Sequence, residues 1–193
     1  MRVRDSGMPP LAHWESVVPA RRLLEAFDFS GRGTASEFGC GYGTFTQLLA
    51  EQFDRVQAMD MDPSMVTATR RRVQPRENVE VHCLDFLAED FPVQSGTVDV
   101  VLLFHILHLK EPLDLLGRAK TLLRPGGLIA CLHWHPDRET PRGPKAAWRP
   151  TLERYRAWSK ELGLGAPREV PLDDCEHHLA VTYQPTAVDA GTR

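Results

Sequence analysis

The feature that most constrains this chain is a regular alternation of short apolar runs and segments with helical periodicity between residues 34 and 134. The apolar runs lie at residues 34–39, 55–60, 78–84, 97–104 and 128–133. Helical patterns follow the first, second and fourth of these runs. Such an alternation predicts βα units around a parallel sheet. The run at 97–104 is apolar on both faces, which is typical of a central parallel strand.

The C-terminal third of the chain departs from this pattern. An amphipathic helix is predicted from about residue 150, with apolar residues at helical spacing up to Leu162 and an end at Gly163. Two short strand-like runs follow, near 169–172 and 179–183, with only polar residues between them. Two strands without a helix between them are expected to pair antiparallel. We therefore predict an α/β fold with a seven-stranded, mostly parallel, doubly wound sheet and an antiparallel strand pair at the C-terminal end.

Composition and charge exclude several classes of function. The 193 residues include 23 basic and 26 acidic side chains, a net charge of −3, so we expect no nucleic-acid or membrane partner. The four cysteines stand far apart without a C-x-x-C pair, which predicts free thiols rather than a disulfide or a metal site. The N-terminus lacks the apolar stretch of a signal peptide, and no run approaches the roughly 18 apolar residues of a membrane span. A cytoplasmic location is expected.

A glycine-rich segment, EFGCGYGT at residues 37–44, follows the first predicted strand. Glycines at this place let the backbone turn tightly and approach a ligand closely. Their spacing is G-x-G-x-G, whereas a dinucleotide-binding turn has G-x-G-x-x-G. Glu37 lies two residues before the first glycine, where a carboxylate can receive an ammonium group directly or through water. This combination suits an amino-acid ligand better than a diphosphate.

Two further acids follow the second and third predicted strands. Asp60 comes 21 residues after Gly39, at a place where a carboxylate can accept both ribose hydroxyls of an adenosine. The alternative for Asp60 is a helix cap or a solvated loop acid. Asp85 and Phe86 follow the third strand, where they could bind the amino group and the ring of an adenine. Because parallel strands end at one edge of the sheet, the three acids are expected to converge there.

These segments together resemble class I S-adenosylmethionine-dependent methyltransferases. EFGCGYGT is similar to their first motif, AMDMDPSMV to their acidic second motif and CLDF to their adenine-contacting loop. TVDVVLLFHILHL resembles their fourth strand, and LLRPGG the turn before their fifth. The resemblance covers about residues 34 to 134. Two positions depart from the usual pattern: Glu37 replaces the commoner Asp, and Phe104 stands where many relatives have a small or polar residue.

The resemblance implies S-adenosylmethionine as the cofactor and S-adenosylhomocysteine as the product. It places the methionine portion on Glu37 and the glycine loop, the ribose on Asp60 and the adenine on the residues around Asp85, with the sulfonium beside the end of the fourth strand. The residues that it assigns to cofactor binding are Glu37, Gly39, Cys40, Gly41, Asp60, Met61, Asp85, Phe86 and Phe104.

The candidates for catalysis are histidines. Methyl transfer from a sulfonium is an in-line displacement, and a hydroxyl or ammonium acceptor must also lose a proton. A thiolate, an unprotonated amine or an activated carbon needs no base. His105 and His108 follow the fourth predicted strand and His133 ends the fifth, so each is a candidate base. Each also has a structural alternative, as a side chain that packs or caps a loop.

Two segments rich in Pro, Gly, Arg and Trp are predicted to cover the acceptor. They are residues 1–18 and 134–148, and their candidate substrate-binding residues are Trp14, Trp134 and Arg142. Arg142 stands in a stiff Pro-Arg-Gly-Pro turn, where it could anchor a carboxylate or phosphate. Alternatively, Arg142 points to solvent and the loop only covers the sheet.

The sequence therefore predicts one domain over residues 1–193 that transfers a methyl group from S-adenosylmethionine to a small molecule. Residues 1–33 form an N-terminal cap and helix, 34–134 the cofactor-binding core, and 135–193 the substrate-side loop, last helix and closing strands. A non-catalytic S-adenosylmethionine-binding protein on the same scaffold is the first alternative. A nicotinamide-dependent oxidoreductase is the second, although G-x-G-x-x-G and Tyr-x-x-x-Lys are absent. An Asn-Pro-Pro-Tyr or Asp-Pro-Pro-Tyr stretch for base or amide methylation is absent as well.

Overall fold

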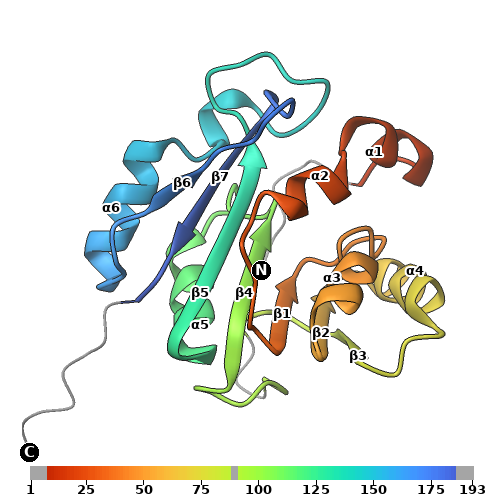
Figure 1. The fold of residues 1–193 in the computed structure, drawn as a ribbon. Helices are drawn as coiled ribbons and strands as arrows, with labels where there is room; N and C mark the ends of the chain where they lie inside the picture. The colour runs from red at the N-terminus through yellow and green to blue at the C-terminus, as the bar shows by residue number, and fades with distance from the viewer. Residues whose placement is uncertain (1–7, 88–90, 186–193) are drawn as a thin grey trace, which may run out of the picture.

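The computed structural model describes residues 8–87 and 91–185 and shows one seven-stranded sheet in the order β3-β2-β1-β4-β5-β7-β6 (Figure 1). The first five strands are parallel, and β7 runs antiparallel to both β5 and β6. This arrangement confirms the predicted fold class. The strands are β1 (Thr34–Phe38), β2 (Arg55–Asp60), β3 (Val79–Cys83), β4 (Val98–Phe104), β5 (Leu123–Trp134), β6 (Arg168–Val170) and β7 (His178–Tyr183).

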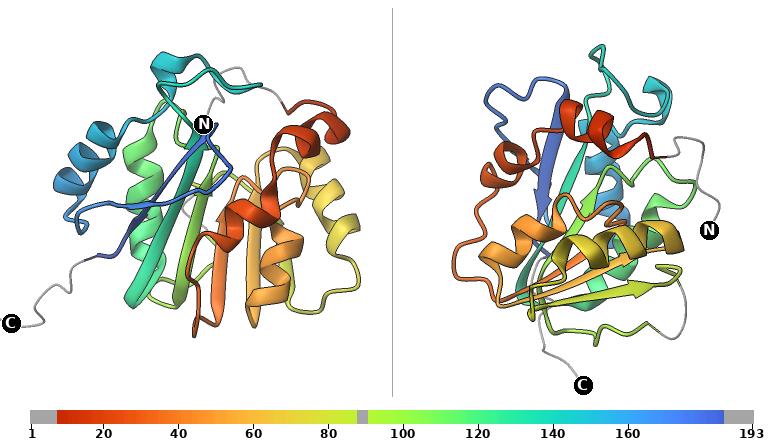
Figure 2. Two further views of the ribbon diagram at one scale, coloured as in Figure 1. Left: turned by 45° about the horizontal axis from the view of Figure 1, so that its top comes forward. Right: turned by 90° about the vertical axis from the view of Figure 1, so that its right-hand side faces the viewer.

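Helices cover both faces of the sheet (Figure 2). One face packs against α5 and α6, and the other against α2 and α3, while α4 lies beside β2 and β3. The short α1, which precedes α2 in the chain, lies near the carboxyl ends of the strands (Figure 1). The helices are α1 (Leu11–Val17), α2 (Ala20–Glu25), α3 (Thr46–Gln52), α4 (Pro63–Val73), α5 (Pro112–Leu122), a 3₁₀ turn η1 (Ala146–Trp148) and α6 (Leu152–Leu162).

The central strand β4 divides two hydrophobic clusters. Val101 and Leu103 point into the cluster under α5 and α6, and Val100 and Leu102 into the cluster under α2 and α3. All seven residues of β4 are buried, as expected for a parallel strand that is covered on both faces. The continuous apolar run in the sequence therefore fixes the centre of the sheet.

The ends of two helices follow the expected local rules. Asp62 caps α4 by accepting a hydrogen bond from the Ser64 N–H at 2.8 Å, and Pro63 fills the first turn. Gly163 ends α6 with a left-handed backbone at φ +59°. Asp62 therefore orients the chain just after β2, where the predicted ligand edge begins.

Strand β5 begins earlier than predicted, at Leu123 rather than Leu128. The Pro-Gly-Gly segment is part of the strand, because Leu123 pairs with Val98 across an irregularity in the ladder with β4. Tertiary pairing with β4 thus overrides the turn signal of this segment.

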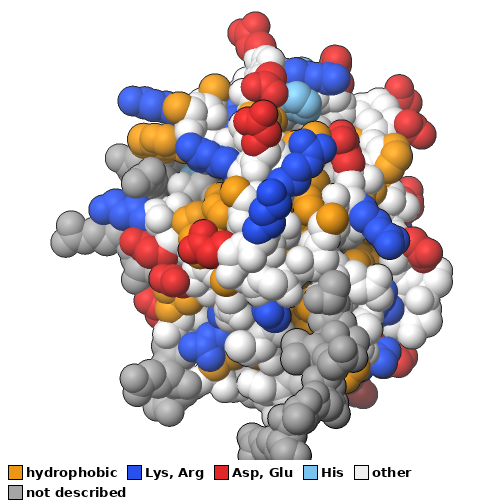
Figure 3. Space-filling model, turned by 90° about the vertical axis from the view of Figure 1, so that its left-hand side faces the viewer, with side chains coloured by type: hydrophobic (Ala, Val, Ile, Leu, Met, Phe, Trp, Pro, Cys, Tyr) orange, Lys and Arg blue, Asp and Glu red, His pale blue; other side chains and the backbone are white. Residues whose placement is uncertain are grey.

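In the ranges that the structure describes, no helix has the length and apolar character needed to cross a membrane. On the face at the α6 side of the molecule, basic and acidic side chains are interspersed (Figure 3). Cys40, Cys131 and Cys175 are buried free thiols, whereas Cys83 is free and exposed.

Candidate cofactor and acceptor site

The glycine segment after β1 turns back against its neighbours. Its three glycines, Gly39, Gly41 and Gly43, adopt positive φ angles of +78°, +55° and +74°. The Gly39 N–H donates to the Met59 carbonyl of β2 at 2.8 Å. A Cβ on Gly43 would lie 3.1 Å from Thr69 of α4. Glycine is therefore required both by the backbone conformation and by the close contact with α4.

Asp60, the last residue of β2, holds this loop. One carboxylate oxygen accepts a hydrogen bond from the Gly41 N–H at 2.9 Å, and the other accepts from the Asp62 N–H at 3.0 Å. Burial raises the pKa of the Asp60 carboxyl, although both N–H groups oppose this shift. Asp60 is thus neither a helix cap nor a solvated acid, since Asp62 caps α4 and Asp60 is turned toward the loop.

Glu37, the fourth residue of β1, is a buried acid. Its side chain is 2% exposed and accepts a hydrogen bond from the Thr46 hydroxyl at 2.6 Å. Burial raises the pKa of Glu37 to about 8, and the nearby charge of Asp60 acts in the same direction. Among the described residues, no arginine or lysine forms an ion pair with it. A carboxyl in this position is suited to a positively charged ligand.

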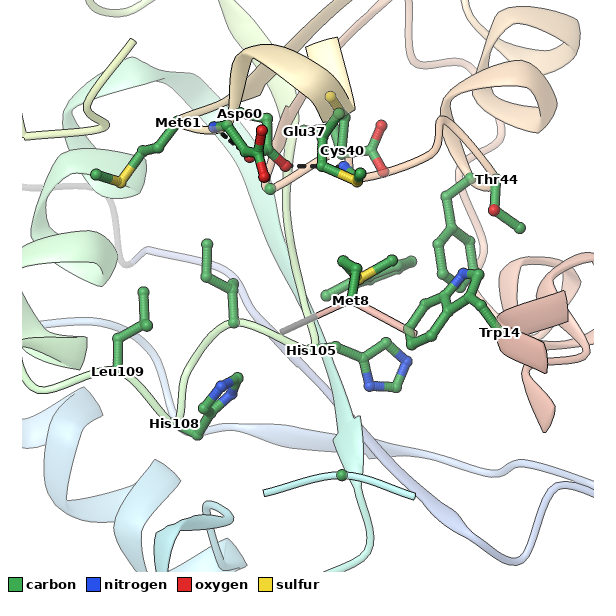
Figure 4. A pocket seen from close by; sticks show the side chains of 18 of the residues that line it. Met8, Trp14, Glu37, Cys40, Thr44, Asp60, Met61, His105, His108 and Leu109 are labelled. Carbon is green, nitrogen blue, oxygen red and sulfur yellow. Dashed lines mark hydrogen bonds between the residues drawn. The ribbon is translucent and has the colours of Figure 1, made fainter. Parts of the chain in front are cut away.

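A pocket of about 330 Å³ opens above the carboxyl ends of β1, β2, β4 and β5 (Figure 4). Its volume is in the range of small-molecule binding sites. The acids Glu37 and Asp60 lie at one side, and His105 and Trp14 lie at the other (Figure 4). Most residues that the sequence assigned to cofactor binding, substrate binding or catalysis line this pocket. They are Glu37, Gly39, Cys40, Gly41, Asp60, Met61, Phe86, Phe104, Trp14, Trp134, Arg142, His105 and His108.

Two of the predicted site residues do not line the pocket. Asp85 accepts a hydrogen bond from the Leu87 N–H at 2.9 Å, so its carboxylate stabilises the turn after β3. Its neighbour Phe86 does line the pocket and stacks on Phe38 of the core, with ring centroids 5.4 Å apart. His133 is fully buried in β5 and reaches the pocket only through a second histidine.

His133 and His108 are joined by a hydrogen bond of 3.1 Å between His133 Nε2 and His108 Nδ1. The other nitrogen of His133, Nδ1, lies 3.3 Å from the Trp134 carbonyl, which can only accept. We therefore assign the proton of His133 to Nδ1 and the bridging proton to His108 Nδ1. Burial lowers the pKa of His108 to about 4 and that of His133 to about 3, so both are neutral at neutral pH. His133 thus orients His108.

The N-terminal segment covers the glycine loop. The Tyr42 hydroxyl donates a hydrogen bond to the Pro9 carbonyl at 2.8 Å. Arg72 of α4 donates to the Thr44 hydroxyl at 2.9 Å and forms an ion pair with Glu15 of α1. These contacts hold Met8 and Trp14 against the pocket. The predicted contribution of residues 1–7 lies outside the described residues.

The loop after β5 folds over Trp134. Gly143 has φ +123°, and a Cβ on it would lie 2.5 Å from the indole ring, so only glycine permits this contact. The buried Arg149 fastens the loop by donating to the Pro144 and His135 carbonyls, each at 2.9 Å. Arg142 is consequently carried to the pocket wall.

The sequence did not indicate Thr46, Tyr42, Arg72 or Arg149. Each of these side chains acts through a partner five or more residues away in the chain. Tyr42 stands inside the glycine segment, but that segment does not indicate its hydrogen bond to Pro9. A buried arginine such as Arg149 has no local signal, because its carbonyl partners become close only after the loop has folded.

Comparisons with known proteins agree with this geometry. Residues 36–131 match the model of a family described as "Methyltransferase domain". A "Probable S-adenosylmethionine-dependent methyltransferase" of Mycolicibacterium smegmatis is 31% identical over 114 residues, which are 56% of this chain and 42% of that protein. A "Probable ribosomal RNA small subunit methyltransferase A" of Methanosarcina mazei is 35% identical over 71 residues, 37% of this chain and 26% of that protein.

A solved structure, a SAM-dependent methyltransferase from Aquifex aeolicus, superposes with a TM-score of 0.76 at 22% identity. The match covers 91% of this chain and 94% of that one, and it shows a common fold. The curated relatives above are matched over less than half of their own length.

Fold and site together define a Rossmann-like α/β protein. Its ligand site is lined by carboxyl groups and lies at the topological switch point of the sheet. Residues 36–131 belong to the methyltransferase-domain family, and the fold is that of class I S-adenosylmethionine-dependent methyltransferases. S-adenosylmethionine is the cofactor of that family. The residues present fit it, since the buried carboxyl of Glu37 can receive an ammonium group and the apolar wall beside Asp60 suits an adenosine.

Proposed function

We propose that this protein is an enzyme that transfers the methyl group of S-adenosylmethionine to a small-molecule acceptor. The observation that carries the proposal is the buried Glu37, next to the glycine loop and on the same side of the pocket as Asp60. A site for a dinucleotide would place a pyrophosphate at this loop, where the carboxylate of Asp60 would repel it and the carboxyl of Glu37 would offer it no positive charge.

In this proposal the acids and the loop bind the cofactor. Glu37 receives the ammonium group, and the glycine loop permits close approach of the methionine portion. Asp60 accepts the ribose hydroxyls with the lone pairs not used by Gly41 and Asp62. Met61 and Phe86, which both line the pocket, pack against the adenine.

When bound, the cofactor supplies an electrophilic methyl group on a positively charged sulfur. The chain's own residues orient the acceptor and exclude water. Trp14, held by α1, and Trp134, held under Gly143, close the pocket from two sides. Arg142 lines the same wall, where a guanidinium suits a carboxylate or phosphate of the acceptor.

A small acceptor is favoured because residues of α1 and of the loop around Arg142 both line the pocket, whose volume is about 330 Å³. The net charge of −3 also offers no general attraction for RNA. One relative is nevertheless described as a ribosomal RNA methyltransferase, so RNA is the acceptor class to test against.

Cofactor with a trideuterated methyl group tests this directly. The protein is incubated with separate small-molecule, RNA and protein fractions of a cell extract, and the products are analysed by mass spectrometry. The proposal expects deuterated methyl groups in the small-molecule fraction, and far fewer when Asp60→Ala protein is used at the same low cofactor concentration. Label confined to RNA or protein would contradict the small-molecule assignment, and no label in any fraction would favour a non-catalytic binding protein.

A further inference from the structure

A second cavity adjoins the pocket described above. Its volume is about 260 Å³, and it opens between the loop after β4 and the start of α6. His108 and Leu109 line both cavities, and Figure 4 shows them across the first pocket from Asp60. The two cavities therefore lie side by side, with these two side chains at their common border. Besides His108 and Leu109, the walls of the second cavity include Lys110, Trp148, Arg154 and Trp158.

The charge of the second cavity is opposite to that of the first. Lys110 and Arg154 bring two positive charges, and no carboxyl group is among its described lining residues. Glu111 and Glu153 are their neighbours in the sequence but do not line the cavity. Within the described ranges, neither Lys110 nor Arg154 forms an ion pair. A cavity with two such cations and no carboxyl attracts an anion.

The chain around the second cavity is basic as a whole. Residues 138–156 contain six basic and two acidic side chains, although the full chain has 23 basic and 26 acidic ones. In this stretch the buried Arg149 donates only to backbone carbonyls, and the ammonium group of Lys145 lies 5.6 Å from the centre of a Trp148 ring. Neither contact cancels a positive charge, so both cations add to the field that an anion would meet here.

Two tryptophans give the second cavity apolar walls. Trp158 of α6 packs edge to face on the fully buried Tyr155, with ring centroids 5.5 Å apart and planes at 86°. Trp148 ends η1, where its N–H donates to the Lys145 carbonyl at 2.9 Å. The fold thus holds both rings in place. Apolar ring surface beside two cations suits an anionic group that is attached to an organic molecule.

The second cavity has the size of one part of a ligand. Sites that enclose a whole small molecule measure about 300–1,000 Å³, and this cavity is smaller, at about 260 Å³. The first pocket must hold the cofactor as well as the reacting end of the acceptor. The rest of the acceptor therefore needs space beside the first pocket, and the second cavity provides it at the border formed by His108 and Leu109.

We propose that the second cavity binds a carboxylate or phosphate group of the methyl acceptor. This inference rests on the proposed methyltransferase function and adds the chemical class of the substrate, an organic anion. The reacting group enters the uncharged aromatic side of the first pocket, and the anionic group reaches the second cavity, where Lys110 and Arg154 bind it. The guanidinium can hold two anionic oxygens in its plane, while the ammonium acts as a point charge.

This arrangement keeps like charges apart. Asp60 would repel an anion close to it, and it lies across the first pocket from His108 (Figure 4). The cofactor's positive charge stays with the carboxyls, and the acceptor's negative charge stays with the two cations. Because each ligand is drawn to a different end, the acceptor's reacting atom is held at the methyl group in one orientation.

The four tryptophans of the chain provide a direct test, because two of them line each cavity. Trp14 and Trp134 line the first pocket, and Trp148 and Trp158 line the second. Protein that contains 5-fluorotryptophan should give four ¹⁹F NMR signals, which single Trp→Phe variants assign. Phenyl phosphate should shift the signals of Trp148 and Trp158 in a saturable way. Phenol, which has the same ring without the charge, should not shift them at equal concentration.

Charge variants measure the part played by each cation. Lys110→Gln and Arg154→Gln should each weaken binding of phenyl phosphate about fivefold, and the double variant about 25-fold. Arg156→Gln is the matched control, since Arg156 is an exposed arginine of α6 that does not line the second cavity. This control should keep the wild-type affinity. All of these variants should bind S-adenosylhomocysteine as the wild type does.

The methylated product shows where the anionic group comes from. The small-molecule fraction from the experiment with deuterated cofactor is passed over an anion-exchange resin, which retains carboxylates and phosphates. The label should be in the retained compounds, and at low substrate concentration it should form several-fold more slowly with Arg154→Gln than with Arg156→Gln. Label only in unretained, neutral compounds would show that the anion is not part of the acceptor and would overturn the substrate class.

The remaining outcomes separate the proposed function from this inference. If S-adenosylhomocysteine does not bind, the methyltransferase function fails and the inference fails with it. If it binds but phenyl phosphate leaves Trp148 and Trp158 unchanged, or shifts only Trp134 beside the Arg142 loop, the function stands and the second cavity is not an anion site. Equal shifts with phenol would show that the two cations play no part, which also overturns the inference.

Discussion

The two sides of the pocket differ in charge although they belong to neighbouring strands of one sheet. β1 and β2 deliver the carboxyls of Glu37 and Asp60, whereas the ends of β4 and β5 deliver imidazole and indole rings. β1 and β4 are adjacent, with Glu37 paired to Leu102, so the change from acidic to neutral aromatic occurs across one strand spacing. This position is the topological switch point of the sheet, where the chain reverses the direction in which strands are added.

The difference shows how one pocket can hold a cation and a neutral partner in fixed places. A positively charged ligand is drawn to the side with the carboxyls, because no described arginine or lysine pairs with Glu37. The other side offers buried rings and neutral histidines, which suit an uncharged molecule. The experiments below separate the two sides.

The largest effect is expected at Asp60. Asp60→Ala should weaken binding of S-adenosylhomocysteine by about 1.5 to 3 kcal/mol, because charge-assisted hydrogen bonds to the ribose and the bond to Gly41 are lost. Calorimetry measures the affinity, and thermal unfolding checks the fold. Asp54→Ala changes an exposed acid just before the opposite end of β2 and should bind normally. Unchanged affinity in Asp60→Ala would make Asp60 a structural acid of the loop.

Glu37 should make cofactor binding depend on pH. Its pKa of about 8 means that the empty protein carries a neutral carboxyl at pH 7, while an ammonium ligand favours the ionised form. Affinity for S-adenosylhomocysteine should therefore rise by up to about tenfold per unit between pH 6 and pH 7.5, with release of a proton. Glu37→Gln, which can still accept from Thr46, should remove this dependence. An identical pH profile in the variant would show that Glu37 does not meet the ammonium.

The same carboxyl affects stability in the opposite direction. Because its folded-state pKa is raised, the native protein holds a proton that the unfolded chain loses above its ordinary pKa near 4.5. Its contribution to the free energy of unfolding therefore falls as pH rises from about 4.5 to about 8. Chemical denaturation across this range should show a smaller decrease for Glu37→Gln than for the wild type. An equal decrease in both proteins would assign the pH dependence to other groups.

The smallest effect is expected on the acceptor side, at Arg142. Arg142→Ala should raise the Michaelis constant of an identified acceptor several-fold and leave cofactor affinity unchanged. Arg138→Ala is the matched control, since Arg138 stands in the same loop but pairs with Glu176 and does not line the pocket. If the two variants behave alike, the loop around Arg142 covers the sheet without binding the acceptor.

The acidic side could be predicted from the sequence because it is encoded locally. The glycine segment, Glu37 and Asp60 each lie at or next to a strand end, and parallel strands bring such ends to one edge. Asp85 shows the limit of this reasoning, because its carboxylate is used within its own turn. The seven strands and their mostly parallel arrangement followed equally from the periodic pattern, with the start of β5 misplaced where strand pairing outweighed a Pro-Gly-Gly signal.

The aromatic side could be predicted only in outline. Trp14, His105, Trp134 and His178 come from four separate segments, and their contacts depend on how α1, β4, β5 and β7 pack. The His133–His108 hydrogen bond and the left-handed backbone at His105 have no signature in a single sequence. The sequence proposed three histidines of equal standing, and the structure gives them different surroundings: one buried in β5, one oriented by it and one without a described partner.

The central claim is that the acidic side binds the cation of S-adenosylmethionine. Isothermal titration of the wild-type protein with S-adenosylmethionine, S-adenosylhomocysteine and NAD(H) tests it most directly. The account predicts micromolar affinity for the first two ligands and negligible binding of NAD(H), because Asp60 would repel a pyrophosphate and Glu37 would offer it no positive charge. Tighter binding of NAD(H), or no binding of either sulfur ligand by a folded protein, would contradict it.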